Sequence, residues 1–173
     1  MIQKYFLPLF LLVNLSLFAQ DKSIFDIARK GTITEVKDAY TRNPESINTL
    51  NEDGYSALIL ACYRGNVDVA LFLIEKANNL NYISGDGTAL MAAIMSGNTK
   101  IIDSLIDHKA DLNLSDAQGK TALIYATFFN KTEIAKKLLK AGANKTLKDS
   151  DGKSALDFAN ANKNTELIIL LDQ

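Results

Sequence analysis

Few side chains in this sequence could perform covalent chemistry. There is one cysteine, Cys62, and one histidine, His108. A nucleophilic cysteine needs a base beside it, and these two residues fall in separate helical segments, so we interpret Cys62 as a structural, half-buried residue. We expect His108 to be exposed near a helix end, where a cation is favoured. The sequence therefore offers no cysteine–histidine nucleophile.

Acidic residues are the other candidates for catalysis or metal binding. Asp53 and Asp86 could act as a hydrolase pair, but acid–base catalysis needs a positioned pair in a water-excluding pocket. The segment Asp149-Ser150-Asp151-Gly152 is partly similar to a calcium loop but lacks the remaining acidic ligands, so we interpret it as a turn. Serine-hydrolase, zinc-protease, phosphate-binding and dinucleotide motifs are absent from the sequence. We predict that the protein is not an enzyme and uses no cofactor or metal; a hydrolase is the less favoured alternative.

Charge and size limit the kinds of partner. The 173 residues include 19 basic and 20 acidic side chains, a net charge of −1, which gives no strong field to attract nucleic acid or anionic lipid. The basic strip Lys136, Lys137 and Lys140 falls on one helical segment and is typical of a solvated face. This length suits one compact domain or one short repeat array. We expect a monomer with a protein partner and no nucleic-acid partner.

The first residues have the pattern of a secretory signal peptide. Lys4 supplies a positive start, residues 5–18 are mostly apolar, and Ala19 is a small residue suited to cleavage. The apolar run is too short to span a bilayer, and Asn14 interrupts it. We predict a signal peptide over residues 1–19 and a periplasmic or secreted bacterial protein with no membrane contact after cleavage. An intracellular scaffold with an uncleaved N-terminal anchor is the alternative.

A repeat runs through the rest of the chain. Its most regular feature is a Ser/Thr-Ala-Leu triplet preceded by a glycine and followed, three residues after the leucine, by an alanine. The four leucines lie 32, 33 and 33 residues apart. The triplets begin at Ser56, Thr88, Thr121 and Ser154, the glycines are Gly54, Gly87, Gly119 and Gly152, and the alanines are Ala61, Ala93, Ala126 and Ala159. So many positions in one register predict a structural unit that is repeated in space.

Each unit has the signals of a turn followed by two helices. The glycine suits a tight turn with positive φ, and the Ser or Thr after it can cap a helix whose Ala and Leu fill one face. That helix can end in the left-handed conformation at Gly65 and Gly97, and Asn130 takes the same place in the next unit. A second helix follows, with apolar pairs such as Val69 and Leu73 at i, i+4 spacing. One unit cannot bury its apolar face alone, so the units must stack.

The repeat resembles that of the ankyrin family, whose unit of about 33 residues is a hairpin turn, two antiparallel helices and a Thr-Pro-Leu-His signature. Residues 53–81 and 118–143 match it most closely, and the resemblance covers residues 22–173. It implies an all-α ankyrin-repeat solenoid of stacked helix-turn-helix units with short β-hairpin turns, over residues 20–173. We place the five units at residues 21–50, 51–83, 84–115, 116–148 and 149–173, with the first and last as capping units.

Departures from the family signature bear on the contacts between units. Alanine replaces the signature proline in four units, and the signature histidine is absent from them. The hydrogen bonds that this histidine makes in the family must be missing, so we expect apolar packing to compensate. The third turn is one residue shorter, between Gly87 and Thr88.

The resemblance also implies a recognition surface, formed by the tips of the turns and the exposed side of the first helices. The side chains that match these positions are Asp53, Tyr55, Asp86, Lys120 and Lys153 at the turns, and Tyr63, Arg64, Met95, Phe128 and Phe129 near the helix ends. Tyr, Arg, Met and Phe are enriched at interface cores, and solvent-facing phenylalanine usually marks a contact site. For the two phenylalanines, burial against a neighbouring unit is the alternative.

Together these features predict an exported ankyrin-repeat module that binds a protein through its concave face. Inhibitor, immunity and protective roles toward another exported protein all stay open, because the sequence does not choose among them.

Overall fold

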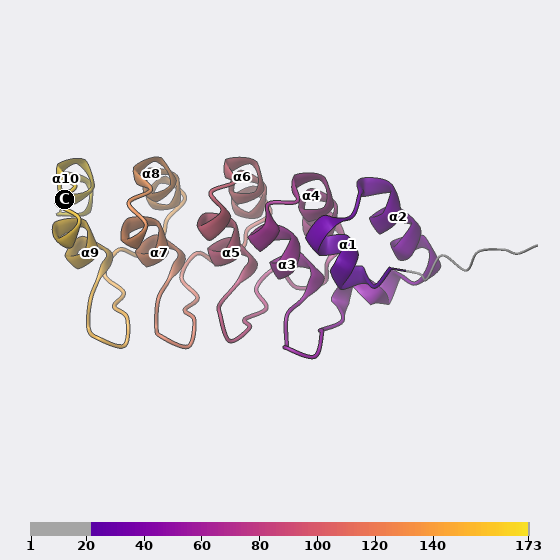
Figure 1. Cartoon of the computed structure of the whole chain (residues 1–173). Helices are drawn as coiled ribbons and strands as arrows, with labels where there is room; N and C mark the ends of the chain where they lie inside the picture. The colour runs from indigo at the N-terminus through magenta and orange to yellow at the C-terminus, as the bar shows by residue number, and fades with distance from the viewer. Residues whose placement is uncertain (1–21, 173) are drawn as a thin grey trace, which may run out of the picture.

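The computed structural model describes residues 22–172, so the signal peptide expected over residues 1–19 lies outside the described part of the chain. Over the described residues there are ten α-helices, one 3₁₀-helix and no strand (Figure 1). In chain order these are α1 (Ile24–Lys30), α2 (Ile33–Arg42), η1 (Pro44–Asn48), α3 (Ala57–Arg64), α4 (Val67–Lys76), α5 (Ala89–Ser96), α6 (Thr99–Asp107), α7 (Ala122–Phe128), α8 (Thr132–Lys140), α9 (Ala155–Ala161) and α10 (Thr165–Asp172). The predicted all-α class is confirmed.

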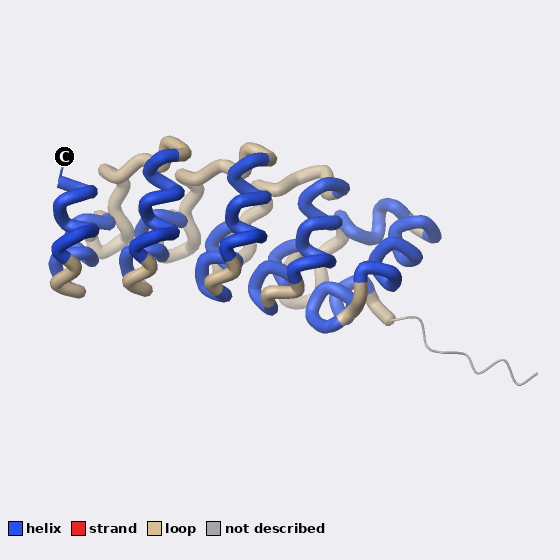
Figure 2. The backbone as a smooth tube through the Cα atoms, turned by 90° about the horizontal axis from the view of Figure 1, so that it is seen from above, coloured by secondary structure: helices blue, strands red, loops and turns tan. Residues whose placement is uncertain are grey.

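The helices stack as pairs along one direction. The first helices, α1, α3, α5, α7 and α9, follow one another in one layer, and the second helices, α2, α4, α6, α8 and α10, form the other (Figures 1 and 2). The loops that lead from one pair to the next project to one side as a row of hairpins (Figure 1). We call these hairpins fingers; each is closed by one isolated β-bridge, and they comprise residues 50–56, 84–87, 115–121 and 148–154.

The first helices begin and end at the residues that the repeat pattern predicts. The residues that cap their N-termini, each accepting the amide hydrogen of the residue three positions on, are Ser56, Thr88, Thr121 and Ser154. Such a cap contributes about 1 kcal/mol relative to alanine. At the other end Gly65 and Gly97 have φ of 66° and 75°, and Asn130 has φ of 55°. The left-handed residue turns the chain sharply, so that the second helix packs back on the first.

The fingers are held by hydrogen bonds inside each hairpin. In the fourth unit Asp116 Oδ1 accepts the backbone amides of Gln118 and Lys120. Asp149 Oδ1 makes the same pair of bonds in the fifth unit, so the segment that is partly similar to a calcium loop is a turn. The finger of the third unit, residues 84–87, is the one with the shorter turn, and it closes with a tighter bridge than the others.

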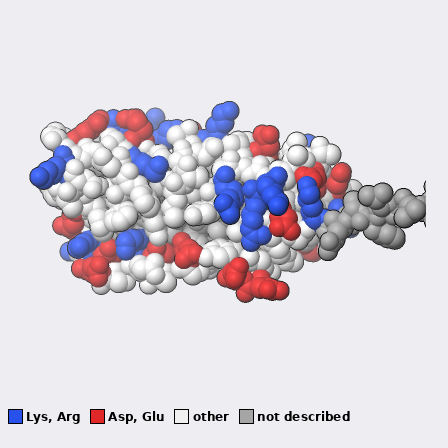
Figure 3. Space-filling model, viewed as in Figure 1, with Lys and Arg blue, Asp and Glu red and all other residues white. Residues whose placement is uncertain are grey.

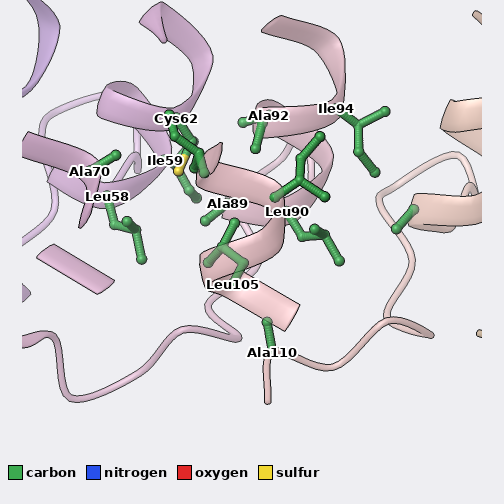
Figure 4. Packing of buried hydrophobic residues seen from close by; sticks show 14 of the residues in the cluster. Leu58, Ile59, Cys62, Ala70, Ala89, Leu90, Ala92, Ile94, Leu105 and Ala110 are labelled. Atoms are coloured by element: carbon green, nitrogen blue, oxygen red, sulfur yellow. The ribbon is translucent and has the colours of Figure 1, made fainter. Parts of the chain in front are cut away.

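One hydrophobic core runs the length of the stack. Leucines of the repeated triplet, such as Leu58 and Leu90, are 3% and 1% exposed and lie between the helices (Figure 4). The repeated alanines Ala61, Ala93 and Ala126 are fully buried, and their small side chains let neighbouring first helices approach closely. Full burial of a leucine side chain is worth about 1.5–3 kcal/mol, so stability comes mainly from the contacts within and between units.

Cys62 is more buried than the sequence suggests. Its exposed fraction is 0% rather than the partial burial expected, because α3 is packed against α1, α4 and α5 and buries every residue from Ala57 to Cys62. Burial raises the pKa of the Cys62 thiol well above its ordinary value. The side chain is therefore a small core residue with no access for a substrate.

Asparagine side chains provide polar contacts between units where the signature histidine is missing. Asn48 Oδ1 accepts the amide of Asn78 at 3.0 Å, and Asn81 Oδ1 accepts the amide of Asp111 at 2.8 Å. Asn113 repeats this bond one unit later. The expectation that apolar packing alone would compensate is therefore incomplete, since each of these bonds ties one unit to the next.

Candidate protein-binding surface

A groove of about 430 Å³ lies between the first helices and the fingers of the N-terminal units. Its floor is apolar and consists of the buried or nearly buried side chains of Ile59, Leu60 and Ala92. Its other lining residues are Arg29, Tyr55, Tyr63, Arg64, Asp86, Thr88, Met95 and Tyr125. An apolar hollow with a few polar groups at its edges is the usual form of a binding site.

Two tyrosines of the groove are held in place through their hydroxyl groups. The Tyr55 hydroxyl donates to Asp86 Oδ2 on the next finger, and this hydrogen bond is the main reason why the pKa of Tyr55 is raised. The Tyr125 hydroxyl donates to Asp116 Oδ2 at 2.6 Å. Burial, followed by that hydrogen bond, raises the pKa of Tyr125. Both rings are therefore oriented before any partner binds, which lowers the entropy cost of using them in an interface.

Two arginines line the groove at the ends of neighbouring first helices. The Arg64 guanidinium lies over the Tyr63 ring, 5.9 Å from its centroid. An Arg29 guanidinium nitrogen is 3.7 Å from Asp26 Oδ1. Figure 3 shows Lys and Arg side chains gathered over α1 and α3, with Asp and Glu on the finger below them. The N-terminal part of this face thus carries opposite charges on its two sides.

An aromatic cluster continues from the groove toward the C-terminal units. Phe128 and Phe129 are 47% and 41% exposed, and their rings are 5.1 Å apart in an edge-to-face arrangement. Phe129 also stacks with Tyr125, and Phe128 packs edge-to-face on Phe158 at 5.5 Å. The two phenylalanines therefore both contact neighbouring aromatic rings and remain open to solvent. We call Tyr125, Phe128, Phe129 and Phe158 the aromatic cluster.

The structure brings some of the sequence-predicted residues together and separates others. Tyr55, Tyr63, Arg64, Asp86 and Met95 line the groove. The remaining predicted residues lie apart from it, in the aromatic cluster or on other fingers: Phe128, Phe129, Asp53, Lys120 and Lys153.

The two predicted lysines take part in contacts between or within units. Lys120 Nζ is 3.6 Å from the buried carboxylate of Asp149 on the next finger. Lys153 Nζ lies 6.0 Å from the centroid of the Phe158 ring. Asp53 lines a second, more open hollow beside Arg29. Of these three residues, Lys120 is mainly a structural contact between fingers.

Sequence reasoning missed three kinds of groove residue. Arg29 lies in the last turn of α1, two positions before Gly31, the same place that Tyr63 has before Gly65. Extending the repeat register to the capping unit would have found it. Tyr125 lies one helical turn before Phe129, and residues four apart share a helix face. The groove floor could not be recognised, because its side chains have the pattern of ordinary core residues.

The described residues show no arrangement suited to catalysis. Among residues 22–172, no group of three or more His, Cys, Asp or Glu side chains could hold a metal ion. Asp86, half of the considered hydrolase pair, accepts the Tyr55 hydroxyl, and Asp53 and Asp86 line different hollows. His108 is exposed, as expected, and its Nδ1 lies 2.8 Å from the Ser104 carbonyl oxygen. None of the helices in this part of the chain has the length and apolar content needed to cross a membrane.

Stacked helix pairs, a row of fingers and an open groove on the finger side define a helical-repeat protein of the protein-binding class. A family model of ankyrin repeats in three copies matches residues 24–116, 78–149 and 111–172. The chain belongs to the ankyrin-repeat family, as its sequence pattern predicts. Proteins of this family are generally interaction modules rather than enzymes, and the comparisons indicate no catalytic family.

The similar proteins are eukaryotic or viral and mostly much longer. The chain is 39% identical over 100 residues to the rat "Ankyrin repeat and SAM domain-containing protein 6", which is 57% of this chain and 11% of that protein. It is 33% identical over 95 residues to the human "BCL-6 corepressor-like protein 1", covering 54% of this chain and 5% of that one. A putative ankyrin repeat protein of fowlpox virus is 31% identical over 89 residues, 51% of this chain and 20% of the viral protein. The matched stretch is thus no more than 20% of the length of any of these three proteins.

Proposed function

We propose that this chain is an exported module that binds another protein through the groove and the aromatic cluster. The observation that carries the proposal is the continuous surface from Tyr63 and Met95 to Phe128 and Phe129, where large apolar side chains are exposed on the finger side. Exposed apolar patches of this kind mark contact sites, and preorganised tyrosine and arginine side chains are the residues that dominate binding energy.

Export is the second part of the proposal. Its support is the three-part pattern of residues 1–19, with Lys4, an apolar run and a small residue at the end. Edman sequencing of the protein from the exported fraction of its host tests it. A mature N-terminus near Gln20 is expected, and a chain in the cytoplasm that still begins with Met1 would refute export.

The binding role is tested with two matched triple variants. Tyr63→Ala, Arg64→Ala and Phe128→Ala together remove the centre of the surface but only exposed side chains. The control triple is Lys100→Ala, Lys140→Ala and Ile169→Ala, which are equally exposed but lie on the second helices. Circular dichroism melting should show that both triples fold.

Pull-down from the native host then compares the two variants with the wild type. We expect the first triple to lose a partner that the wild type and the control both retain, since losing two hot-spot side chains at about 2 kcal/mol each weakens binding by roughly a thousandfold. Equal recovery of every partner by all three proteins would count against the proposal. Inhibitor, immunity and protective roles are distinguished by the activity of the captured protein with and without this chain.

A further inference from the structure

The two arginines of the groove are not satisfied by strong ion pairs. Among the described residues no carboxylate forms an ion pair with Arg64 within 4.0 Å, and the Arg64 guanidinium lies over the Tyr63 ring. Arg29 has one carboxylate, Asp26, at 3.7 Å on its own helix and partly exposed, and exposed pairs of that kind are weak. Both guanidinium groups are therefore available to a ligand.

The surroundings of these arginines favour a carboxylate. The groove's one acidic side chain, Asp86, already accepts the Tyr55 hydroxyl. On the Met95 side of the groove the neighbouring surface consists of aromatic and aliphatic side chains, which exclude water once a partner covers them and so strengthen a charge pair. Guanidinium groups bind carboxylates with two parallel hydrogen bonds. An acidic group next to an apolar one thus fits both halves of the groove.

The surface continues beyond the groove in both directions. Past Arg29 there is the second hollow, whose lining includes the acidic side chains Asp26, Glu52 and Asp53. Past Met95 there is the aromatic cluster. A bound chain that uses this whole surface must pass through the groove rather than end there, so the carboxylate comes from a side chain and not from a C-terminus.

The geometry points to a specific class of ligand: an extended internal segment of the partner, with an Asp or Glu side chain between the guanidinium groups of Arg29 and Arg64. On one side of it a basic residue lies over the acidic hollow, and on the other side large apolar or aromatic residues lie along Met95 and the aromatic cluster. Packed helices lie 8–10 Å apart and an extended chain advances about 3.3 Å per residue, so each unit accommodates about three residues. Five first helices correspond to a segment of roughly 11 residues. This inference rests on the proposed function, because it specifies the partner of the same surface.

The test is a display selection of random 12-residue peptides on the purified full chain. Each peptide is presented in two formats, with a free C-terminus and as a loop closed at both ends. The selection is run on the wild type, on Arg64→Glu, and on Lys140→Glu as a control with the same charge change on the exposed end of α8. Melting curves establish that both variants fold.

We expect peptides from the wild-type selection to be enriched in one Asp or Glu with aromatic residues on one side of it, in both formats. Arg64→Glu should weaken those peptides about tenfold or more, and exchanging their acidic residue for lysine should recover the loss. Lys140→Glu should leave the affinities unchanged. An enrichment without an acidic residue, one that Arg64→Glu does not alter, or one limited to free C-termini overturns the inference.

These outcomes are separable from those of the pull-down. If the groove triple variant loses its host partner but the selected peptides carry no acidic preference, the proposed function stands and the ligand class is wrong. If peptides follow the charge of residue 64 but no host protein depends on the surface, the groove binds the stated chemistry and the proposed function is wrong.

Discussion

Replacing Tyr125 with phenylalanine should destabilise the fold while leaving the aromatic cluster in place. The Tyr125 hydroxyl donates to Asp116 Oδ2 at 2.6 Å, and Asp116 is only 6% exposed. Without that donor the carboxylate keeps its backbone bonds but has one buried oxygen unsatisfied. A hydrogen bond to a charged group contributes about 1.5–3 kcal/mol, and 1 kcal/mol moves the melting temperature of a domain of this size by roughly 2–4 °C. We expect Tyr125→Phe to melt about 4–8 °C below the wild type.

The fifth unit contains the reciprocal case. Phe158 follows Asp149 by nine residues, as Tyr125 follows Asp116, and the two fingers make the same backbone hydrogen bonds. Asp149 Oδ2 is buried without a hydrogen bond and has Lys120 Nζ at 3.6 Å. Phe158→Tyr should supply the missing donor, keep the ring contacts, and raise the melting temperature by a few degrees.

The assay is thermal unfolding at neutral pH, followed by circular dichroism, of the wild type, both single variants and the double variant. The Tyr125 hydroxyl is protonated at this pH, since the ordinary tyrosine pKa is about 10 and burial raises the pKa of Tyr125 further. Because the two changes act in opposite directions, the double variant should melt between the two single variants. A Tyr125→Phe protein that melts with the wild type, or a Phe158→Tyr protein that is less stable than it, would refute the assigned role of the tyrosine–aspartate bond.

Three further predictions concern the fingers and the contacts between units. Gly119 and Gly152 have nearly equal φ of 77° and 76°, but a Cβ at Gly119 would lie 2.8 Å from a backbone nitrogen of the next finger, whereas a Cβ at Gly152 would meet nothing within 4 Å. In urea unfolding, Gly152→Ala should therefore lower the unfolding free energy by about 1 kcal/mol and Gly119→Ala by at least about 2 kcal/mol. Equal losses would contradict the close approach at Gly119. Asn81→Ala should lower the unfolding free energy by about 1–2 kcal/mol and speed hydrogen exchange of the Asp111 amide, because that amide loses the Asn81 oxygen to which it donates. Unchanged exchange of the Asp111 amide would show that the bond is not formed. The hydrogen bond from the backbone amide of Lys153 is the main cause that lowers the pKa of Asp149, so this carboxylate stabilises the fold fully above its unfolded pKa of about 3.9, and the stabilisation is lost as the pH falls through the lower folded pKa. Unfolding free energies measured from neutral pH to about pH 2.5 should therefore fall less steeply for Asp149→Asn than for the wild type. Parallel curves for the two proteins would exclude this contribution.

The repeat pattern was enough to predict the fold class because each signal acts locally. Ser56 caps a helix through an amide three residues away, and Gly65 ends it through its own φ. The spacing of the leucines defines which side of each helix is apolar, and the small size of each unit then requires stacking. Local propensity, turn chemistry and patterning agree with one another in the four units that carry the repeated triplet, which is the condition under which sequence reasoning succeeds.

The candidate site was predicted only in part, for a geometric reason. Residues were assigned to the surface by their place in the repeat, and this found Tyr63, Arg64 and Met95. It also included Lys120, whose ion pair with a neighbouring finger is invisible in a single unit. Arg29 was missed because the capping unit lacks the repeated triplet. A surface that crosses units depends on the distances between side chains of different units. The repeat register gives each residue's place within its own unit but not these distances.

The sequence by itself determined where the helices end, how many helix pairs have a capping residue, which side of each helix is apolar, and to which family the chain belongs. All of these follow from residues close together in the chain. Only the tertiary structure decided which side chains share the groove, that Tyr55 and Tyr125 are held by carboxylates, that Cys62 is completely buried, and that asparagine side chains join the units. The Tyr55–Asp86 bond and the asparagine bonds join residues 30 or 31 positions apart in sequence, so their distances are set by the packing of one unit on the next. The Tyr125–Asp116 bond spans nine residues and depends on how a finger lies against the helix that follows it.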